Sequence, residues 1–444
     1  MLYGKTSKPL GNFSTVPQEM KGSDGIQGQQ YLYTFVSSGI GMGKNGLSDF
    51  FETFLEKEPV FQNKKILQPN YIPDEIEHRD KEINLLANIL APALRLESPS
   101  NIFLYGKTGT GKTLCAKHTT ENMLTVANQR EIPLKVLYLN CKLKRVADTE
   151  YRLIAQIISE FGIDVPATGL PTDEIYKIFY NLLEKKEQLV ILILDEIDQL
   201  VKKAGDGIIY NLTRMNSELK KSQISFVGVS NDLLFIDNMD PRVKSSLSEE
   251  EIVFPPYNAL QLQDILRMRT KKAFKDGVIQ SGVIEKCAAY AAREHGDARR
   301  ALELLRVAGE LCERDGHQEI TMDYLDLAEQ KIERDRIAEI IKTQPKQHHA
   351  ALYSIITLCE KQKGAVSTGE VYNVYKNLCD RIKLRPLTQR RLSDILAELD
   401  MFGVINADII SKGRFGRTRE ISLSIPTNAI ENVKKMLEKG LDLS

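Results

Sequence analysis

One eight-residue segment constrains the fold of this chain more than any other. Residues 106–113 read GKTGTGKT, between the apolar run NIFLYG and a stretch whose apolar residues have helical spacing. Glycines let backbone N–H groups turn inward around an anion, and the N-terminus of the following helix adds a favourable dipole. The segment therefore predicts a strand, a phosphate-binding loop and a helix, in that order.

The residue types in this loop divide the binding of a nucleotide between them. Lys112 offers a positive charge to the β- and γ-phosphates, and Thr113 offers a hydroxyl to Mg²⁺. We expect ATP or ADP, with Mg²⁺, as the ligands. The predicted phosphate-binding residues are Gly106, Lys107, Thr108, Gly109, Thr110, Gly111, Lys112 and Thr113.

Asp195 and Glu196 form the second half of the predicted site, because they follow the apolar run LVILIL. An Asp at the carboxyl end of a buried strand can reach a Mg²⁺ that Thr113 holds. Glu196 can act as the general base, or orient the water that attacks the γ-phosphate. The alternative for Glu196 is a solvated carboxylate at a strand end. The acidic pair favours ATP hydrolysis over simple nucleotide binding.

Apolar runs alternate with helical patterns from residue 47 to residue 255. Four runs, at 101–106, 135–140, 189–196 and 224–231, have the length and apolar character of buried parallel strands. This alternation predicts an α/β base domain over 47–255, with a parallel sheet and helices on both faces. Residues 1–46 contain nine glycines and no persistent period, so we expect a flexible tail there.

The strand signals stop after Phe254. Residues 256–342 have the periodic apolar positions of a small helical domain, and the pattern breaks at Thr343-Gln344-Pro345. Residues 343–444 then show helical patterns at 348–362, 368–382 and 388–402, followed by two β-like runs. Three helices before a hairpin are the order of a winged-helix module.

Charge and cysteine usage limit the cellular context. The 60 Lys and Arg residues balance the 60 Asp and Glu residues, so any nucleic-acid contact must come from a local patch. The six cysteines form no CxxC, which favours free thiols in a reducing compartment.

We interpret the pair His348-His349 as a solvated helix start and not as a metal site. No run of about 18 apolar residues and no signal-peptide pattern occurs, so we expect a cytoplasmic, nucleoid-associated protein without a membrane partner.

A basic patch lies between the two β-like runs. Its residues between 411 and 419 alternate with glycines and include no acid, which suits a hairpin tip that enters a minor groove. The preceding helix at 388–402 has polar N-terminal residues that can face a major groove. The alternative is a solvated turn. The candidate DNA-binding residues are Thr388, Arg390, Arg391, Lys412, Arg414, Phe415, Arg417 and Arg419.

With these motifs together, the chain resembles an AAA+ ATPase, and more narrowly the archaeal origin-recognition, cell-division-cycle-six-type replication initiators. The resemblance covers roughly residues 60–430. It implies that Asn231 is the first sensor and that Arg242, in the segment DPRV, is the arginine finger. It implies that Arg299, in GDARR, is the second sensor, with Arg300 as the alternative. A surface arginine that caps a turn is the alternative for Arg242.

The resemblance also places residues around the nucleotide base. Tyr257 and Arg269 would line the pocket from the lid side. Ile72 and Pro73, in the segment Tyr71 to Arg79, would line it from the N-terminal side. Between Tyr151 and Lys186 the chain resembles the initiator-specific insertion that contacts origin DNA. Its central part carries no Lys or Arg, so we expect backbone and helix-end contacts there.

By this resemblance the chain is an ATP-dependent initiator that binds double-stranded origin DNA and helps recruit or load the replicative helicase. Slow, switch-like hydrolysis and self-association on DNA are part of that expectation. One alternative is a clamp-loader-like or remodelling ATPase that works as a ring on DNA or protein. The other is a regulator in which the nucleotide is only structural. Glu196 and Asn231 argue against this last alternative, because a structural nucleotide needs no positioned water.

Overall fold

The computed structural model describes residues 51–52, 55–142, 149–166, 169–235, 238–247, 249–362, 364–411 and 417–443. The chain divides into two units, Met1–Glu58 and Pro59–Ser444. The predicted tail, residues 1–46, lies outside the described residues. The helices and strands of the second unit lie between Lys64 and Gly440. None of its described helices is long and apolar enough to span a membrane.

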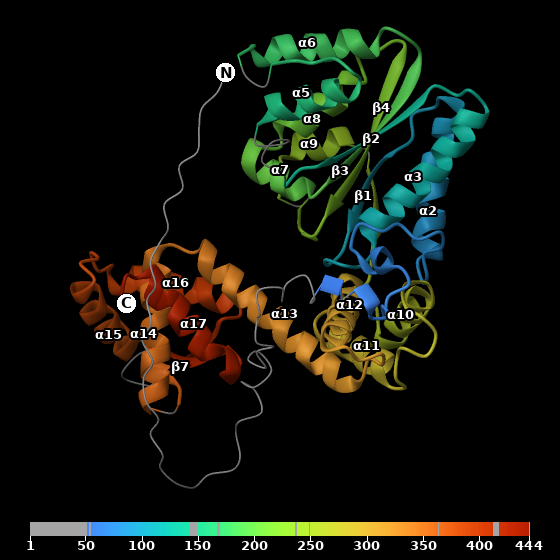
Figure 1. The fold of residues 1–444 in the computed structure, drawn as a ribbon. Helices are drawn as coiled ribbons and strands as arrows, with labels where there is room; N and C mark the ends of the chain where they lie inside the picture. The colour runs from blue at the N-terminus through green and yellow to red at the C-terminus, as the bar shows by residue number, and fades with distance from the viewer. Residues whose placement is uncertain are drawn as a thin grey trace, which may run out of the picture. The chain divides into compact units, whose positions relative to one another are not determined.

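A parallel sheet of five strands in the order β2-β3-β4-β1-β5 occupies the first part of the described chain (Figure 1). Four strands are the predicted ones: β1 Asn101–Tyr105, β2 Leu134–Asn140, β3 Gln188–Asp195 and β4 Ser222–Ser230. The fifth, β5 Glu249–Val253, was not predicted. It begins with three glutamates and lies at the sheet edge beside β1, where polar side chains remain in water, so it lacks the apolar signature of a buried strand.

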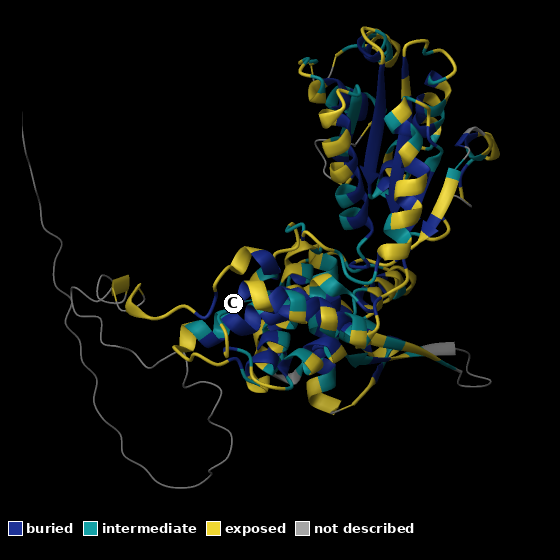
Figure 2. Cartoon of the chain, turned by 90° about the vertical axis from the view of Figure 1, so that its right-hand side faces the viewer, coloured by how far each residue is buried: buried dark blue, intermediate teal, exposed yellow. Residues whose placement is uncertain are grey.

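Helices cover both faces of this sheet, as predicted. The strands alternate their side chains: Ile102 and Leu104 pack toward one face, and Phe103 and Tyr105 pack toward the other. The first face meets α2 (Asp80–Leu90) and α3 (Lys112–Gln129). The second meets α5 (Glu150–Glu160), α6 (Thr172–Leu183), α7 (Ile197–Ala204), α8 (Gly207–Met215) and α9 (Pro241–Leu247). Figure 2 shows the central strands as buried.

A helical lid follows the sheet. It consists of α10 Ala259–Ala273, α11 Val283–Arg293, α12 Ala298–Asp315 and α13 Met322–Thr343. Its core also includes four residues that precede the sheet in sequence: Val60, Phe61, Ile66 and Leu67. The last two belong to the short 3-10 helix Lys64–Leu67. Phe61 stacks on Phe274 with ring centroids 4.8 Å apart. These residues lie within the predicted base domain, 47–255, yet they pack in the lid core, and a contact so distant in sequence leaves no local pattern.

The last part of the chain is a winged helix. Its elements are α14 Lys346–Gln362, β6 Val366–Ser367, α15 Thr368–Arg381, α16 Gln389–Met401, β7 Ile405–Ser411, β8 Arg417–Leu423 and α17 Thr427–Gly440. The three strands form an antiparallel sheet in the order β6-β8-β7. The three helices, the hairpin and the break after Thr343 are confirmed. Helix α17, which packs Val433 and Leu437 into the core, was not predicted.

The expectation for the cysteines is met, and the one for the pair His348-His349 is not. The six cysteines, all within the described residues, are free thiols, and five of them are buried. The prediction that His348-His349 is a solvated helix start is wrong. The His348 side chain is only 12% exposed, and its Nε2 lies 2.7 Å from Glu398 Oε2, because α14 packs against α16 at this point.

Candidate nucleotide site and winged-helix surface

Three neighbouring strands bring the predicted catalytic residues to one edge of the sheet. Strand β4 lies between β1 and β3, and all three run in the same direction. Lys112 follows β1 through the glycine-rich loop, Asn231 follows β4 directly, and Asp195 is the last residue of β3. Because the carboxyl ends of parallel strands meet at one edge, side chains from distant parts of the sequence converge there.

Lys112 is the centre of this convergence. Its ammonium Nζ donates to the carbonyl oxygens of Gly106 (2.6 Å) and Lys107 (2.8 Å) and to Oδ1 of Asn231 (2.9 Å). Only 6% of the residue is exposed. Burial, and then the positive charge of Arg299, lower the pKa of Lys112 to about 8. A buried cation held mainly by neutral oxygens suits the approach of an anion such as a phosphate.

The candidate metal ligands lie together. Thr113 Oγ1 donates to Asp195 Oδ2 at 3.1 Å, and the phenol of Tyr138 donates to the same oxygen at 2.7 Å. Tyr138 lies on β2, next to β3, and the Lys117 ammonium lies 3.6 Å from its ring centroid. Tyr138 lies in the predicted strand 135–140 but was not among the predicted site residues. A single tyrosine in a strand belongs to no motif, so its type and position alone do not indicate a role.

Glu196 adopts an unusual backbone conformation directly after Asp195. Its φ is +55°, in the left-handed region, where a residue with a Cβ is rare. This turn ends β3 and starts α7. The Glu196 side chain is 25% exposed and lies 3.6 Å from Lys142 Nζ. Glu196 follows the candidate metal ligand Asp195 directly in sequence, and its carboxylate is partly open to water, as a base that activates water requires.

A pocket beside the glycine-rich loop contains the predicted base-binding residues. Tyr257, Ile72 and Pro73 line it, with Thr113 from the loop and Arg299 from the lid. The remaining lining combines apolar residues with charged ones. It includes Ile76, Leu114, Ile265, Met268 and Leu302, and also Glu75, Glu77 and Lys117. A pocket with apolar side chains on its walls and a glycine-rich loop beside them fits a purine base joined to phosphates.

Arg269 provides a second test of that fit. It is 6% exposed, and its guanidinium lies 4.7 Å from the Tyr71 ring centroid. Its Nη1 donates to the carbonyl of Ile66, whereas its Nε has no hydrogen-bond partner among the described residues. A buried donor without a partner is costly, so a ligand acceptor in this pocket would be favourable.

The lid helix α12 approaches the loop closely. Asp297 caps this helix by accepting from the N–H groups of Arg299 and Arg300. A Cβ on Gly109, whose φ is +74°, would lie 1.6 Å from Asp297 Oδ1. Position 109 therefore requires glycine, both because of its positive φ and because a Cβ would clash with Asp297.

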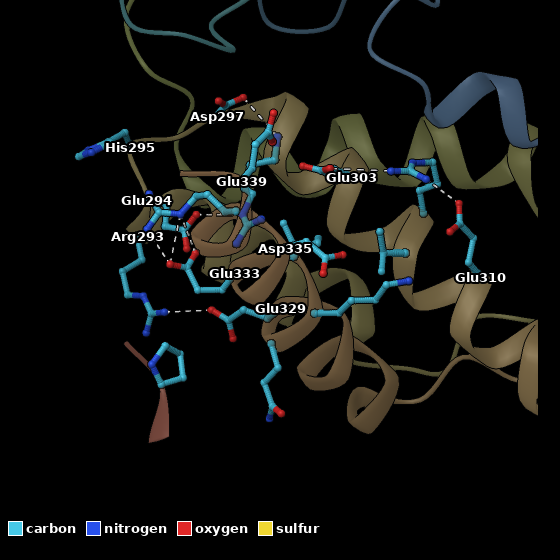
Figure 3. Close-up of a pocket in the computed structure, with 18 residues that line it drawn as sticks. Arg293, Glu294, His295, Asp297, Glu303, Glu310, Glu329, Glu333, Asp335 and Glu339 are labelled. Carbon is cyan, nitrogen blue, oxygen red and sulfur yellow. Dashed lines mark hydrogen bonds and ion pairs between the residues drawn. The ribbon is translucent and has the colours of Figure 1, made fainter. Parts of the chain in front are cut away.

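Arg299 and Arg300 lie in different surroundings. Arg299 lines the nucleotide pocket and affects the pKa of Lys112, whereas Arg300 pairs with Glu294 at 3.0 Å. Arg300 lines a different groove, over α11, α12 and α13. Figure 3 shows carboxylates gathered there, including Glu294, Glu329 and Glu333, so this groove is unsuited to a phosphate. Of the two residues, the geometry favours Arg299 as the second sensor.

Arg242 is the second residue of α9 and lies at the molecular surface. Its side chain is 85% exposed and pairs with Asp240 at 3.2 Å. Among the described residues, its guanidinium hydrogen-bonds to Asp240 and to none of those that line the nucleotide pocket of its own chain. A role as arginine finger would therefore act on the nucleotide of a neighbouring copy.

The described part of the predicted DNA surface centres on α16. Thr388 caps this helix by accepting from the Arg391 N–H, and Arg390 and Arg391 are exposed. Arg391 pairs with Asp394 at 3.3 Å. Arg419, in contrast, donates from Nη1 to the carbonyl of Ser393 on α16, at 2.9 Å.

The structure does not test the DNA-binding residues that were predicted at the tip of the hairpin. Lys412, Arg414 and Phe415 lie outside the described residues. Arg417 begins β8, and its side chain also lies outside what is described.

The predicted insertion between Tyr151 and Lys186 contains α5 and α6. The two helices are tied by Tyr176, whose hydroxyl donates to Glu150 Oε1 at 2.6 Å. Their connection is described except for residues 167–168.

Three family models match the chain in sequence order. An AAA domain matches residues 95–239, a Cdc6 AAA+ ATPase-type lid domain matches 263–330, and a CDC6 C-terminal winged helix domain matches 339–433. The ORC1-type DNA replication protein of Thermococcus onnurineus is 51% identical over 396 residues, which cover 88% of this chain and 95% of the relative. The chain belongs to the ORC1-type DNA replication proteins.

Other ORC1-type proteins agree with this assignment. The relative from Pyrococcus furiosus is 51% identical over 391 residues, covering 87% of this chain and 92% of its own. Among solved structures, the Aeropyrum pernix ORC1 protein in complex with DNA matches with a TM-score of 0.76 and 43% identity, covering 86% of this chain and 98% of that one. The predicted AAA+ sheet, helical lid and C-terminal winged helix are thus confirmed.

Membership of the ORC1-type family makes this chain an AAA+ protein of DNA replication with a nucleotide-binding fold. Three features of the pocket suit a nucleotide: the glycine-rich loop, the buried ammonium of Lys112, and the Nε of Arg269, which has no hydrogen-bond partner among the described residues. The roles of individual residues within it stay predictions.

Proposed function

We propose that this chain is an ATP-dependent initiator that binds origin DNA, changes state between ATP and ADP, and helps recruit or load the replicative helicase. One observation carries this proposal. Lys112, Thr113, Asp195 and Asn231 converge at one sheet edge, in a chain that also presents the exposed N-terminus of α16 in a winged helix. The family's replication relatives support the same conclusion.

Nucleotide binding would use the contacts of Lys112. Its ammonium lies among loop carbonyls and Asn231, so it can turn to phosphate oxygens without leaving the loop. Thr113 and Asp195 would hold Mg²⁺, which neutralises charge between the β- and γ-phosphates when bound. Tyr138 fixes the orientation of the Asp195 carboxylate by its hydrogen bond. Tyr257, Ile72 and Pro73 would enclose the adenosine.

Hydrolysis would need residues from two copies of the chain. Glu196 would accept a proton from the attacking water, and Asn231 would orient that water. Arg299 would reach the γ-phosphate from the lid. Arg242 would act on the nucleotide of a neighbouring copy, where an arginine of this kind raises the rate by roughly 10³–10⁵. A single copy would then turn over slowly, and association on DNA would speed it.

DNA recognition would combine α16 with the hairpin. Arg390 and Arg391 are exposed near the N-terminus of α16, which favours phosphates at the edge of a major groove. Lys412, Arg414, Phe415 and Arg417 would enter the adjacent minor groove. Arg419 has a more structural task here, because its hydrogen bond to Ser393 ties the hairpin to α16. The insertion between β2 and β3 would add backbone contacts.

One helix offers a path between the two functions. Helix α13 places Leu325 and Ala328 in the lid core, and Ile337 and Ile341 in the winged-helix core. Because α13 belongs to both cores, a lid displaced through Arg299 would move the winged helix with it. We propose that the ATP and ADP states differ in DNA binding and helicase recruitment through this connection.

The test separates the two halves of the proposal. Lys112→Ala should abolish ATP binding while leaving measurable affinity for duplex origin DNA. Arg390→Ala with Arg391→Ala should lower DNA affinity while leaving ATP binding intact. If Lys112→Ala removed DNA binding in a protein that is still folded, the modular proposal would fail. Fast turnover by a closed ring would instead favour a remodelling ATPase, and the oligomer mass would show such a ring.

A further inference from the structure

A buried arginine outside the predicted catalytic set joins the glycine-rich loop to the start of the lid. Arg79 precedes α2, and only 2% of the residue is exposed. A charged side chain is rarely buried unless partners satisfy it. The partners of Arg79 come from three separate parts of the chain: the Thr110 carbonyl, the Pro255 carbonyl and the Glu82 carboxylate.

The contact with Thr110 fixes one peptide of the loop. Arg79 Nε donates to the Thr110 carbonyl at 3.0 Å. In a trans peptide the C=O and the N–H of the next residue point in opposite directions, so a carbonyl held by Arg79 turns the Gly111 N–H away from it. Gly111 lines the nucleotide pocket, which makes its N–H a donor for the phosphates.

This peptide needs such a restraint. Gly111 has φ +95°, and glycine adopts positive and negative φ with similar ease. Rotation of the Thr110–Gly111 peptide is therefore sterically cheap, and a rotated peptide would present a carbonyl to the phosphates. The hydrogen bond from Arg79 opposes that rotation.

The same guanidinium holds the connection to the lid. Its Nη2 donates to the Pro255 carbonyl at 2.5 Å, and its Cζ lies 4.0 Å from the Tyr257 ring centroid. Tyr257 lines the nucleotide pocket, and its N–H contacts the carbonyl of Gly296, just before α12. Arg79 thus holds the loop and the first residues of the lid connection at fixed positions relative to each other.

We propose that Arg79 is a positioning residue that orients the Gly111 amide toward the nucleotide phosphates and ties the loop to the Pro255–Tyr257 connection. The inference rests on the proposed nucleotide binding and deepens it. Its consequence is selective: loss of Arg79 weakens recognition of the phosphates more than recognition of the base.

Comparison of ADP with adenosine tests this selectivity. We would measure the dissociation constants of both ligands, by calorimetry and by competition, for the wild type, Arg79→Met and Arg79→Lys. Loss of the oriented Gly111 amide as a donor to the charged phosphates predicts ADP affinity roughly 10- to 100-fold lower in Arg79→Met. Adenosine affinity should fall much less, because Arg79 contacts the base pocket only through the Tyr257 ring, on which a methionine side chain can still pack.

Arg79→Lys separates geometry from charge. A lysine keeps the positive charge but cannot reach two carbonyls with a planar fork, so it should not restore ADP binding. Full recovery with lysine would overturn the positioning role, because only charge would matter. If Arg79→Met does not fold, Arg79→Lys carries the same comparison of ADP with adenosine.

Glu82→Gln serves as the matched control. It removes the charge of the carboxylate that lies 3.3 Å from Arg79, but the amide oxygen can still accept from Arg79 and both carbonyl contacts remain, so ADP affinity should remain near the wild-type value. Equal losses of ADP and adenosine affinity in Arg79→Met would reduce Arg79 to a packing role and overturn the proposal. A wild type that binds no ADP would instead contradict the proposed function itself.

Discussion

The ammonium of Lys112 lies 2.9 Å from Oδ1 of Asn231, so the loop lysine and the predicted first sensor are in direct contact. The two residues are 119 positions apart in sequence and meet because β4 lies beside β1. A phosphate that draws Lys112 toward itself would therefore change the environment of Asn231. Nucleotide binding and the positioning of the attacking water are coupled through this hydrogen bond if both residues have their predicted roles.

Glu196→Gln should separate nucleotide binding from hydrolysis. The amide keeps the size of the side chain but cannot accept a proton from water, and a general base contributes roughly 10²–10⁴ in rate. We expect the ATP dissociation constant to stay within about threefold while single-turnover hydrolysis falls at least about 100-fold. Unchanged hydrolysis would return Glu196 to the role of a solvated strand-end carboxylate.

The pH dependence of ADP binding follows from the pKa of Lys112. Burial and the charge of Arg299 lower this pKa to about 8 in the ligand-free protein, whereas bound phosphates favour the charged ammonium and raise it. Between pH 8 and 9, ADP should bind with uptake of a proton, and its affinity should fall as the pH rises from 7 to 9. Calorimetry in two buffers of different ionisation enthalpy measures the uptake.

Adenosine supplies the control for that experiment, since it carries no phosphate and should bind without proton uptake. ADP binding with no proton exchange at pH 8.5 would show that Lys112 is already fully charged in the free protein.

Mixing two impaired variants tests whether Arg242 acts in trans. Arg242→Ala lacks the arginine but keeps Glu196, whereas Glu196→Gln keeps the exposed Arg242. Each variant alone should hydrolyse ATP slowly on origin DNA, and an equimolar mixture should recover part of the wild-type rate. A mixture no faster than the sum of its parts would place Arg242 in the alternative role of a turn cap next to Asp240.

The exposed arginines of α16 should set part of the salt dependence of DNA binding. Each arginine that no longer neutralises a phosphate reduces the slope of log K against log salt by about 0.9, so Arg390→Ala with Arg391→Ala should reduce it by about 1 to 2. Arg293→Ala is the matched control, because this exposed arginine belongs to the acidic groove of Figure 3 and pairs with Glu329. Equal slopes for the wild type and the double variant would exclude both arginines from phosphate contact.

The sequence predicted those parts of the molecule that local patterns encode. The loop at 106–113, four buried strands and the helices before the hairpin all have signatures in type and spacing. Strand β5 did not, because its glutamates lie on an exposed edge. Residues 60–67 pack on the lid through contacts with residues more than 200 positions away, which no local pattern reveals.

Within the site, the residues with motifs were predictable and their supporting residues were not. Tyr138 has no motif, and Arg79 entered only as the end of the segment Tyr71 to Arg79, where the resemblance pointed to the base and not to the loop. In the structure Tyr138 contacts Asp195, and Arg79 contacts Thr110 and Pro255. The choice between Arg299 and Arg300 likewise needed the structure, since adjacent residues on a helix point in directions about 100° apart.

Binding to DNA tiled across the genome that encodes this chain tests the central claim most directly. The purified protein would be measured with ATP and with ADP, each at two salt concentrations. We predict tight binding at one or a few intergenic sites, with an affinity that differs between the two nucleotides and survives the higher salt. Uniform binding along the genome that the higher salt removes would show only a nonspecific phosphate contact and would contradict the initiator assignment.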